Sequence, residues 1–359
     1  MRITFRKSYK QDIRLFRDGA QAAWYLGFLA LALLMPLLVD GYYLDELSFV
    51  YIYAIAGLGL MILTGFSGQV SFGHAAFVAI GAYAHTILMT RYGVPWLLSV
   101  PLAALLSGIA GLALGRICSK MHGLYLAIAT LAFAIIVERL IGSGGDFTGG
   151  HGGMPVPEIT IFGVELYESW QKYFVNLGMF VGVLLLVRNL TRSRSGRAMI
   201  SIRDSEVSAR GLGVDIAFFK AYAFFLSAAL AGLSGSLLAH AFFFLSPETF
   251  GMGESIRLLL MIVVGGLGTI HGAVFGAFFI MLLPTALSWL KVLLPAGVAS
   301  SSGLDSLAFG LILVVFMLFE PDGLYGRWLK IHHYFNIFPM YKRRSFQRQK
   351  TFLKTERLR

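Results

Sequence analysis

Long stretches without charged side chains alternate along this chain with short segments that concentrate Lys and Arg. A bilayer core about 30 Å thick needs roughly 20 apolar residues per helix, at about 1.5 Å rise per residue. Stretches free of Asp, Glu, Lys and Arg predict single spans at Gln21–Val39, Tyr92–Gly115, Met121–Val137 with its flanks, Tyr173–Val187, Ala221–Pro247 and Ser306–Phe319. The pattern therefore predicts helices that cross a membrane along most of the chain.

Two further stretches are long enough to hold a pair of helices. Leu47–Thr90 has 44 residues, and its natural break is the glycine-rich segment Gly65–Gly73. Leu258–Leu290 has 33 residues, so it holds two helices only if the first, which enters at Glu254, is short, with the break at Gly265–Gly268. The predicted fold is all-α, a polytopic transmembrane helical bundle of about ten spans.

The distribution of basic residues predicts the orientation, because basic segments resist translocation. With a cytoplasmic N-terminus, the inner segments hold 25 of the 30 Lys and Arg residues. The other five lie at or near the outer side: Arg91, Arg139, Lys172, Arg257 and Lys291. An even number of spans with both termini cytoplasmic fits this alternation. It divides the chain into a basic arm (1–20), a transmembrane permease domain (21–320) with an inner loop (191–219) and an outer loop (143–171), and a basic tail (321–359).

Composition supports the same class of protein. Hydrophobic residues make up 57% and charged residues 14% of the chain, whereas a soluble domain carries about 25% charged residues. The single cysteine, Cys118, excludes a disulfide framework and a multi-thiolate metal site. The polybasic segment Tyr341–Arg359 is typical of a solvated tail attracted to anionic lipid and not of a nucleic-acid module. The first apolar run is long enough to stay in the membrane, so we expect no cleaved signal peptide.

The inner loop at 191–219 is the only sizeable internal loop on the cytoplasmic side. Asp204 or Ser205 is suited to cap a short helix there, and Gly211 or Gly213 to end it. A short helix on this face of the membrane is interpreted as a docking surface for a partner protein that moves the membrane domain. The alternative is a structural connector held by basic residues.

The loop resembles the coupling loop of ABC importer permeases, in the form found in branched-chain amino acid permeases. It reads Gly196-Arg197-Ala198-Met199, then Glu206, then Ser208-Ala209, with Ser208 where Ala is usual, then Leu212-Gly213. The resemblance implies that contacts to an ATPase come from Arg203, Glu206, Ser208, Ala209, Gly211, Leu212 and Gly213.

Other segments resemble the same family in the same order, over about residues 50 to 325. They include Gly65–Phe77, Tyr125–Phe133, Thr148–Gly153, Ser246–Phe250 and Gly265–Ala277. The similarity is greatest to the longer of the two permeases in these systems. It implies import of branched-chain or related hydrophobic amino acids through the inner (plasma) membrane of a prokaryote. It also implies a second related permease, two cytoplasmic ATP-binding subunits and a periplasmic or extracellular binding protein. A related permease for urea or short amides is the alternative.

The break at Gly65–Gly73 clusters polar side chains beside four glycines. Non-helical backbone at membrane depth is tolerated only where it lines a cavity or is buried in protein, and it presents free N–H and C=O groups to a substrate. We therefore place the translocation path along Gly68, Gln69, Ser71, Gly73 and His74. The alternative is a cytoplasmic turn that merely joins two spans.

Motifs for catalysis are absent from the sequence. It has no phosphate-binding loop, no His-Glu-x-x-His pair and no Gly-x-Ser-x-Gly elbow. We therefore expect no enzymatic activity, cofactor or metal in this chain, and energy supplied by other subunits. A membrane-embedded enzyme remains the alternative from another class. The outer segment Ser143–Gln171 suits either contact with a substrate-binding protein or a plain glycine-rich connector.

Overall fold

The fold is known from a computed structural model that describes residues 19–161, 163–292, 310–311, 314, 318–319 and 323–337. Most of the basic arm, most of the predicted span at Ser306–Phe319 and the polybasic end of the tail lie outside the described residues.

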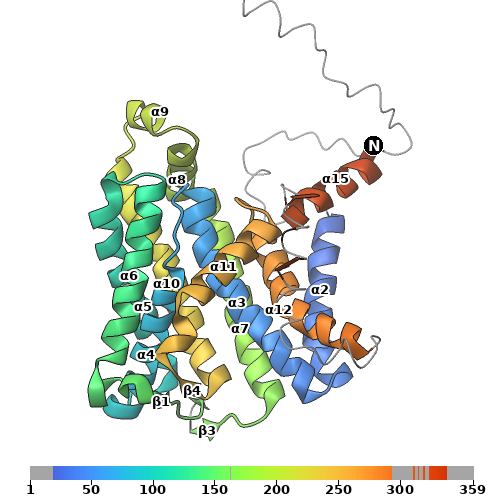
Figure 1. The fold of residues 1–359 in the computed structure, drawn as a ribbon. Helices are drawn as coiled ribbons and strands as arrows, with labels where there is room; N and C mark the ends of the chain where they lie inside the picture. The colour runs from blue at the N-terminus through green and yellow to red at the C-terminus, as the bar shows by residue number, and fades with distance from the viewer. Residues whose placement is uncertain are drawn as a thin grey trace, which may run out of the picture.

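The described part of the chain is an elongated bundle of helices (Figure 1). Its longer helices follow the predicted apolar stretches closely. They are α2 (Gly19–Leu38), α3 (Gly41–Leu60), α4 (His74–Tyr92), α5 (Trp96–Ile117), α6 (Leu124–Gly142), α7 (Ser169–Arg192), α10 (Ile216–Phe242) and α12 (Ile270–Val292). The shorter helices are α8 (Arg194–Asp204), α9 (Glu206–Gly211), α11 (Met252–Gly265) and α15 (Gly323–Ile337).

Six of the described helices are long and apolar enough to cross a membrane: α3 with the π-helical turn that extends it, α5, α6, α7, α10 and α12. In α2 only Ala23–Leu38 meets the apolar criterion, over a shorter length. α11 has 14 residues and rises about 21 Å, less than a bilayer core. The all-α membrane bundle is confirmed, while the number of ten spans stays a prediction.

Both predicted helix breaks are present, and they lie against each other. α3 continues through a π-helical turn at Met61–Phe66, after which the chain is non-helical until His74. α11 ends at Gly265, and α12 begins at Ile270. A Cβ on Gly65 would lie 2.9 Å from the Gly268 nitrogen, so the two glycine clusters permit a backbone approach that side chains would block.

The core of the bundle surrounds α10, which packs against α3, α4 and α5. Small residues line these crossings: a Cβ on Gly59 would lie 2.8 Å from the Ser227 carbonyl oxygen. Serine hydroxyls add interhelical hydrogen bonds, such as Ser234 Oγ to the Ile52 carbonyl at 2.8 Å. Close approach and hydroxyl bonding between helices are how helices associate in lipid, where the hydrophobic effect between them is absent.

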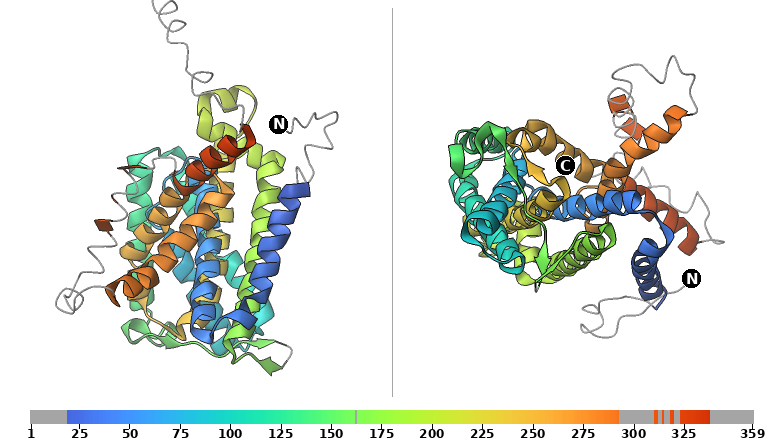
Figure 2. Two further views of the ribbon diagram at one scale, coloured as in Figure 1. Left: turned by 90° about the vertical axis from the view of Figure 1, so that its right-hand side faces the viewer. Right: turned by 90° about the horizontal axis from the view of Figure 1, so that it is seen from below.

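The two ends of the bundle differ in structure. α8 and α9 project from one end, and short strands lie at the other (Figure 1). There β1 (Met154–Pro155) pairs with β4 (Phe244–Leu245), and β2 (Thr160–Ile161) pairs with β3 (Val164–Glu165). Between the helices at this end, Gly150–Gly152 forms one 3₁₀ turn. Its neighbours Gly149 and Gly153 have positive φ angles, which keeps the turn short. α15 lies near the end that carries α8 and α9 (Figure 2).

Candidate coupling surface and translocation segment

The predicted inner loop folds into two capped helices. The Ser193 hydroxyl accepts from the Gly196 N–H at the start of α8, and the Ser205 hydroxyl accepts from the Ser208 N–H at the start of α9. Asp215 caps α10 in the same way, through the Phe218 N–H. These side chains satisfy N–H groups that have no partner in the first turn of a helix. Of the two candidate caps, Ser205 serves α9, whereas Asp204 is the last residue of α8.

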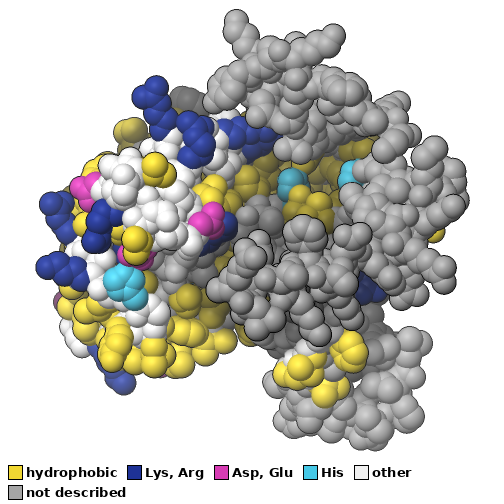
Figure 3. Space-filling model, turned by 90° about the horizontal axis from the view of Figure 1, so that it is seen from above, with side chains coloured by type: hydrophobic (Ala, Val, Ile, Leu, Met, Phe, Trp, Pro, Cys, Tyr) yellow, Lys and Arg dark blue, Asp and Glu magenta, His cyan; other side chains and the backbone are white. Residues whose placement is uncertain are grey.

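The α8–α9 segment has an apolar inner side and an apolar outer side. Ile202, Ala209 and Ile216 are buried together and attach the segment to the bundle. Val207 and Leu212 point outward and are 84% and 81% exposed. Ser208, Gly211 and Gly213 are also exposed. Figure 3, which looks onto this end, shows hydrophobic and basic side chains together on its surface. Their exposure makes this end of the bundle a candidate contact surface for another protein.

An ion-pair cluster fastens α9 to the bundle. Lys220 Nζ lies 2.6 Å from Glu206 Oε1, and the Lys220 side chain is only 3% exposed. His122 Nε2, from the turn between α5 and α6, lies 3.1 Å from Glu206 Oε2. Partial burial alone raises the pKa of the Glu206 carboxyl, but hydrogen bonds from Lys220 and His122 outweigh it and hold the pKa below its usual value. Glu206 is therefore an anion that links three segments of the chain.

We call α8, α9 and the two residues that follow (194–213) the coupling segment. Arg203, in the last turn of α8, contacts residues of both helix breaks. Its Nη1 donates to the Gly65 carbonyl at 2.9 Å, while Nε and Nη2 donate to Asp204 Oδ1 at 3.0 and 2.8 Å. The Arg203 side chain passes close to Gly68: a Cβ on Gly68 would lie 3.0 Å from Arg203 Cγ. It also reaches the second break, because a Cβ on Gly268 would lie 3.2 Å from Arg203 Nη1. A displacement of α8 therefore acts directly on the backbone at Gly65 and Gly68.

The segment predicted to line the path is folded into the interior. Gln69, Ser71, Gly73 and His74 are buried, whereas Gly68 is exposed beneath Arg203. Gln69 Nε2 donates to Ser67 Oγ at 2.6 Å and to the Lys220 carbonyl at 3.4 Å. Lys220 therefore contacts both Gln69 and Glu206. This is a second connection between the Gly65–Gly73 break and the coupling segment, in addition to the one through Arg203.

The far end of this segment is held by two hydroxyl groups. The Phe72 N–H donates to Thr130 Oγ1 of α6 at 3.1 Å, and the Ala75 N–H donates to Ser255 Oγ of α11 at 3.1 Å. A Cβ on Gly73 would overlap the Thr130 carbonyl, so the position requires glycine. These bonds satisfy backbone groups that the helix break leaves free, and they place the start of α4 beside the start of α11.

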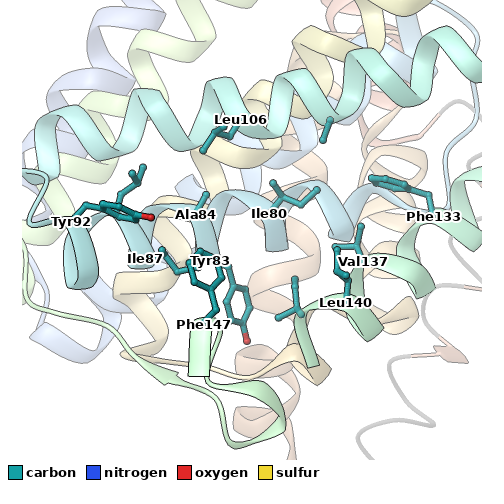
Figure 4. A pocket seen from close by; sticks show the side chains of 13 residues that line it. Ile80, Tyr83, Ala84, Ile87, Tyr92, Leu106, Phe133, Val137, Leu140 and Phe147 are labelled. Atoms are coloured by element: carbon teal, nitrogen blue, oxygen red, sulfur yellow. The ribbon is translucent and has the colours of Figure 1, made fainter. Parts of the chain in front are cut away.

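A groove of about 480 Å³ lies elsewhere, between α4, α5 and α6 (Figure 4). It is lined by apolar and aromatic side chains such as Ile80, Leu106 and Val137. None of the predicted path residues borders this groove. Its lining offers almost no polar group to hold an amino acid.

An ionisable pair inside the bundle escaped the sequence analysis. Arg257, expected at or near the outer side, lies with its guanidinium carbon 5.5 Å from the ring centre of Tyr53. Tyr53 is the thirteenth residue of the 26-residue span Gly41–Phe66, so Arg257 lies at mid-depth. Glu254, one turn earlier on α11, is 3.9 Å from Arg257. α11 has only 14 residues, and Arg257 near its start lies beside the middle of α3.

Comparison with known proteins identifies the family. Residues 42–319 match the family described as "Branched-chain amino acid transport system / permease component". The match covers most of the chain, and it includes the helix breaks, the coupling segment and α11. The chain belongs to this family of ABC transport permeases, a class of membrane transport proteins.

Individual relatives give the same result. The chain is 32% identical over 334 residues to the high-affinity branched-chain amino acid transport system permease protein LivM of Salmonella typhimurium, covering 86% of this chain and 76% of the relative. It is 31% identical to LivM of Escherichia coli over the same shares. It is 27% identical to the permease protein BraD of Pseudomonas aeruginosa, over 77% of this chain and 92% of that relative. No solved structure matches the chain.

Proposed function

We propose that this chain passes branched-chain amino acids inward across the inner membrane of a prokaryote as one permease of a paired permease complex. The names of the relatives, all branched-chain amino acid permeases, support this substrate class. In this proposal the chain has about ten spans with both termini in the cytoplasm. Its partners are a second permease, two ATP-binding subunits and a substrate-binding protein that meets the 143–171 segment.

The observation that carries the mechanism is the double connection between the coupling segment and the helix break. Exposed Val207 on α9 and Leu212 directly after it form the contact for an ATP-binding subunit. Movement of α9 then reaches the break at Gly65 through Arg203, and reaches Gln69 through Glu206 and Lys220. In this proposal Gly68, Gln69, Ser71, Gly73 and His74 change their packing as access alternates and line the open path.

Gln69→Ala tests this mechanism in the complete complex, reconstituted in vesicles with leucine uptake and ATP hydrolysis measured separately. Loss of the two Gln69 hydrogen bonds should lower uptake about fivefold or more, because each is of order 1 kcal/mol, and should leave hydrolysis less affected. Wild-type values for both would show that Gln69 does not belong to the path. Co-purification of the tagged chain without any ATP-binding subunit would contradict the assembly itself.

A further inference from the structure

The start of α11 carries a charged pair of opposite sign, Glu254 and Arg257. Glu254 and Arg257 stand one turn apart, opposite the middle of α3. Glu254 is eleven residues before the end of α11 at Gly265, so it lies about 16 Å above the helix break. That distance is roughly half of a bilayer core. A charged side chain at this depth costs about 2.5–3.5 kcal/mol or more, and such residues are retained where they act.

The geometry of the pair is that of an exchangeable contact. Its closest distance, 3.9 Å between Arg257 Nη1 and Glu254 Oε2, exceeds the roughly 2.7–2.9 Å of a fixed charge-assisted hydrogen bond. Glu254 Oε1 is buried and has no hydrogen-bond partner in the part of the chain that the structure describes. The Tyr53 hydroxyl faces the same carboxyl group. Both charged groups are therefore held in place, but they do not form a short hydrogen bond with each other.

Arg257 also faces outward from this chain. Its side chain is 35% exposed, and Met252 and Gly253 beside it are exposed too. α11 lies at the near face of the bundle in Figure 1. A guanidinium at mid-depth does not face lipid tails without a large cost, so this face borders water or another protein. In a complex of two permeases, a water-filled path between the two chains meets that condition.

We propose that Glu254 and Arg257 form a transient site for the charged end of an α-amino acid halfway along its path, an inference that rests on the proposed function. The Glu254 carboxylate takes the ammonium group, and the Arg257 guanidinium takes the carboxylate. The pair and the zwitterion are each neutral overall, so exchange of partners leaves no uncompensated charge in the membrane. Because a neutral urea or amide has no charge to exchange, the site selects the amino acid class over that alternative.

The site adjoins the end of the Gly65–Gly73 break, where α4 begins. Ser255, next to Glu254, accepts the N–H of Ala75, and Ala75 follows His74. Rearrangement of the break during the ATP cycle therefore moves the first turn of α11 directly. The first turns of both α4 and α11 start at this point, and N–H groups at the start of a half-length helix such as α11 are suited to anionic groups of a substrate.

Uptake measurements provide the first test. In the reconstituted complex, Glu254→Gln and Arg257→Gln should each reduce leucine uptake about tenfold or more, since each removes one charge-assisted contact to the substrate. ATP-binding subunits should co-purify as with the wild type. Glu248→Gln and Arg139→Gln, both exposed and outside the 143–171 segment, are the matched controls and should transport normally. Wild-type uptake in both α11 variants would refute the site, whereas absence of leucine uptake in the wild-type complex would refute the proposed function.

A labelling experiment remains informative if those variants assemble poorly. Cys118 is the only cysteine and is buried, so a Cys118→Ser background allows Arg257→Cys to be labelled alone in the assembled complex. A quaternary ammonium methanethiosulfonate should modify Arg257→Cys, and leucine during turnover should slow the reaction several-fold, while urea should not. Leu105→Cys, exposed at mid-depth of α5, is the lipid-facing control and should stay unmodified. Failure of Arg257→Cys to react, or equal protection by urea, would overturn the proposal.

Discussion

The α8–α9 segment and the start of α11 both contain a Glu paired with a basic residue, but the two pairs differ in geometry. Near α9, Glu206 lies 2.6 Å from Lys220 and 3.1 Å from His122. On α11, Glu254 lies 3.9 Å from Arg257 and keeps a carboxyl oxygen without a partner among the described residues. Short, shared contacts fix two segments so that they move together. A loose pair leaves its charges available to a ligand. In the proposed mechanism, the tight pair transmits movement and the loose pair meets the substrate.

The largest expected effect comes from the outer surface of α9. Val207→Asp together with Leu212→Asp places two carboxylates where the structure exposes two apolar side chains. If these side chains are anchors for an ATP-binding subunit, each contributes about 2 kcal/mol to its binding, or roughly 30-fold in affinity. Leucine uptake should fall to background, and the ATP-binding subunits should no longer co-purify.

Tyr42→Ser is the control for this double variant, because Tyr42 is 64% exposed at the start of α3, near the opposite end of the bundle and outside the 143–171 segment. It should leave assembly and uptake unchanged. Retention of the ATP-binding subunits by the Val207→Asp, Leu212→Asp chain would show that the docking surface lies elsewhere.

An intermediate effect is expected at Arg203, which links α8 to the Gly65 carbonyl. Arg203→Gln removes the bond to the Gly65 carbonyl, while the apolar surface of α9 stays in place. Uptake should fall about tenfold, the equivalent of one charge-assisted hydrogen bond, with ATP hydrolysis and assembly largely retained. Arg194→Gln, in the first turn of the same helix and exposed, serves as the matched control. Equal losses of uptake and hydrolysis would mean that Arg203 supports assembly and not transmission.

Much of this architecture could be predicted from local sequence. The helix breaks at Gly65–Gly73 and Gly265–Gly268 were found because glycine clusters interrupt apolar runs, and Ser205 was one of two candidate caps for α9. The exposure of the coupling segment follows from its polarity. These features depend on residues close together in the chain, where periodicity and capping rules apply.

Features that depend on distant residues could not be predicted in this way. The bond between Arg203 and the Gly65 carbonyl joins residues 138 positions apart, and the sequence around neither residue predicts it. Arg257 was assigned to the outer side because hydropathy alone cannot separate a half-length helix from the end of a full span. α15 was missed because Gly323–Ile337 mixes basic and aromatic residues, and it is packed against α11 and α12 instead of crossing the bilayer. Tertiary packing decides all three.

The smallest expected effect concerns the pH dependence of the tight pair. Because Lys220 and His122 hold the pKa of Glu206 below its usual 4.5 in the folded chain, the carboxylate contributes stability above about pH 4.5. That contribution is lost as the pH falls through the lowered pKa of the folded state. Glu206→Gln should therefore destabilise the chain by about 1 kcal/mol at pH 7, equally at pH 5.5, and progressively less below pH 4.5.

Thermal unfolding of the purified chain in detergent at these pH values measures the difference. Glu248→Gln, an exposed carboxylate at the other end of the bundle, corrects for the general effect of removing one negative charge. A difference between wild type and Glu206→Gln that grows as the pH falls would mean that Glu206 is protonated in the folded chain. The pair with Lys220 would then not be ionic. α9 would have only its apolar contacts to hold it, and the contrast with the loose pair on α11 would disappear.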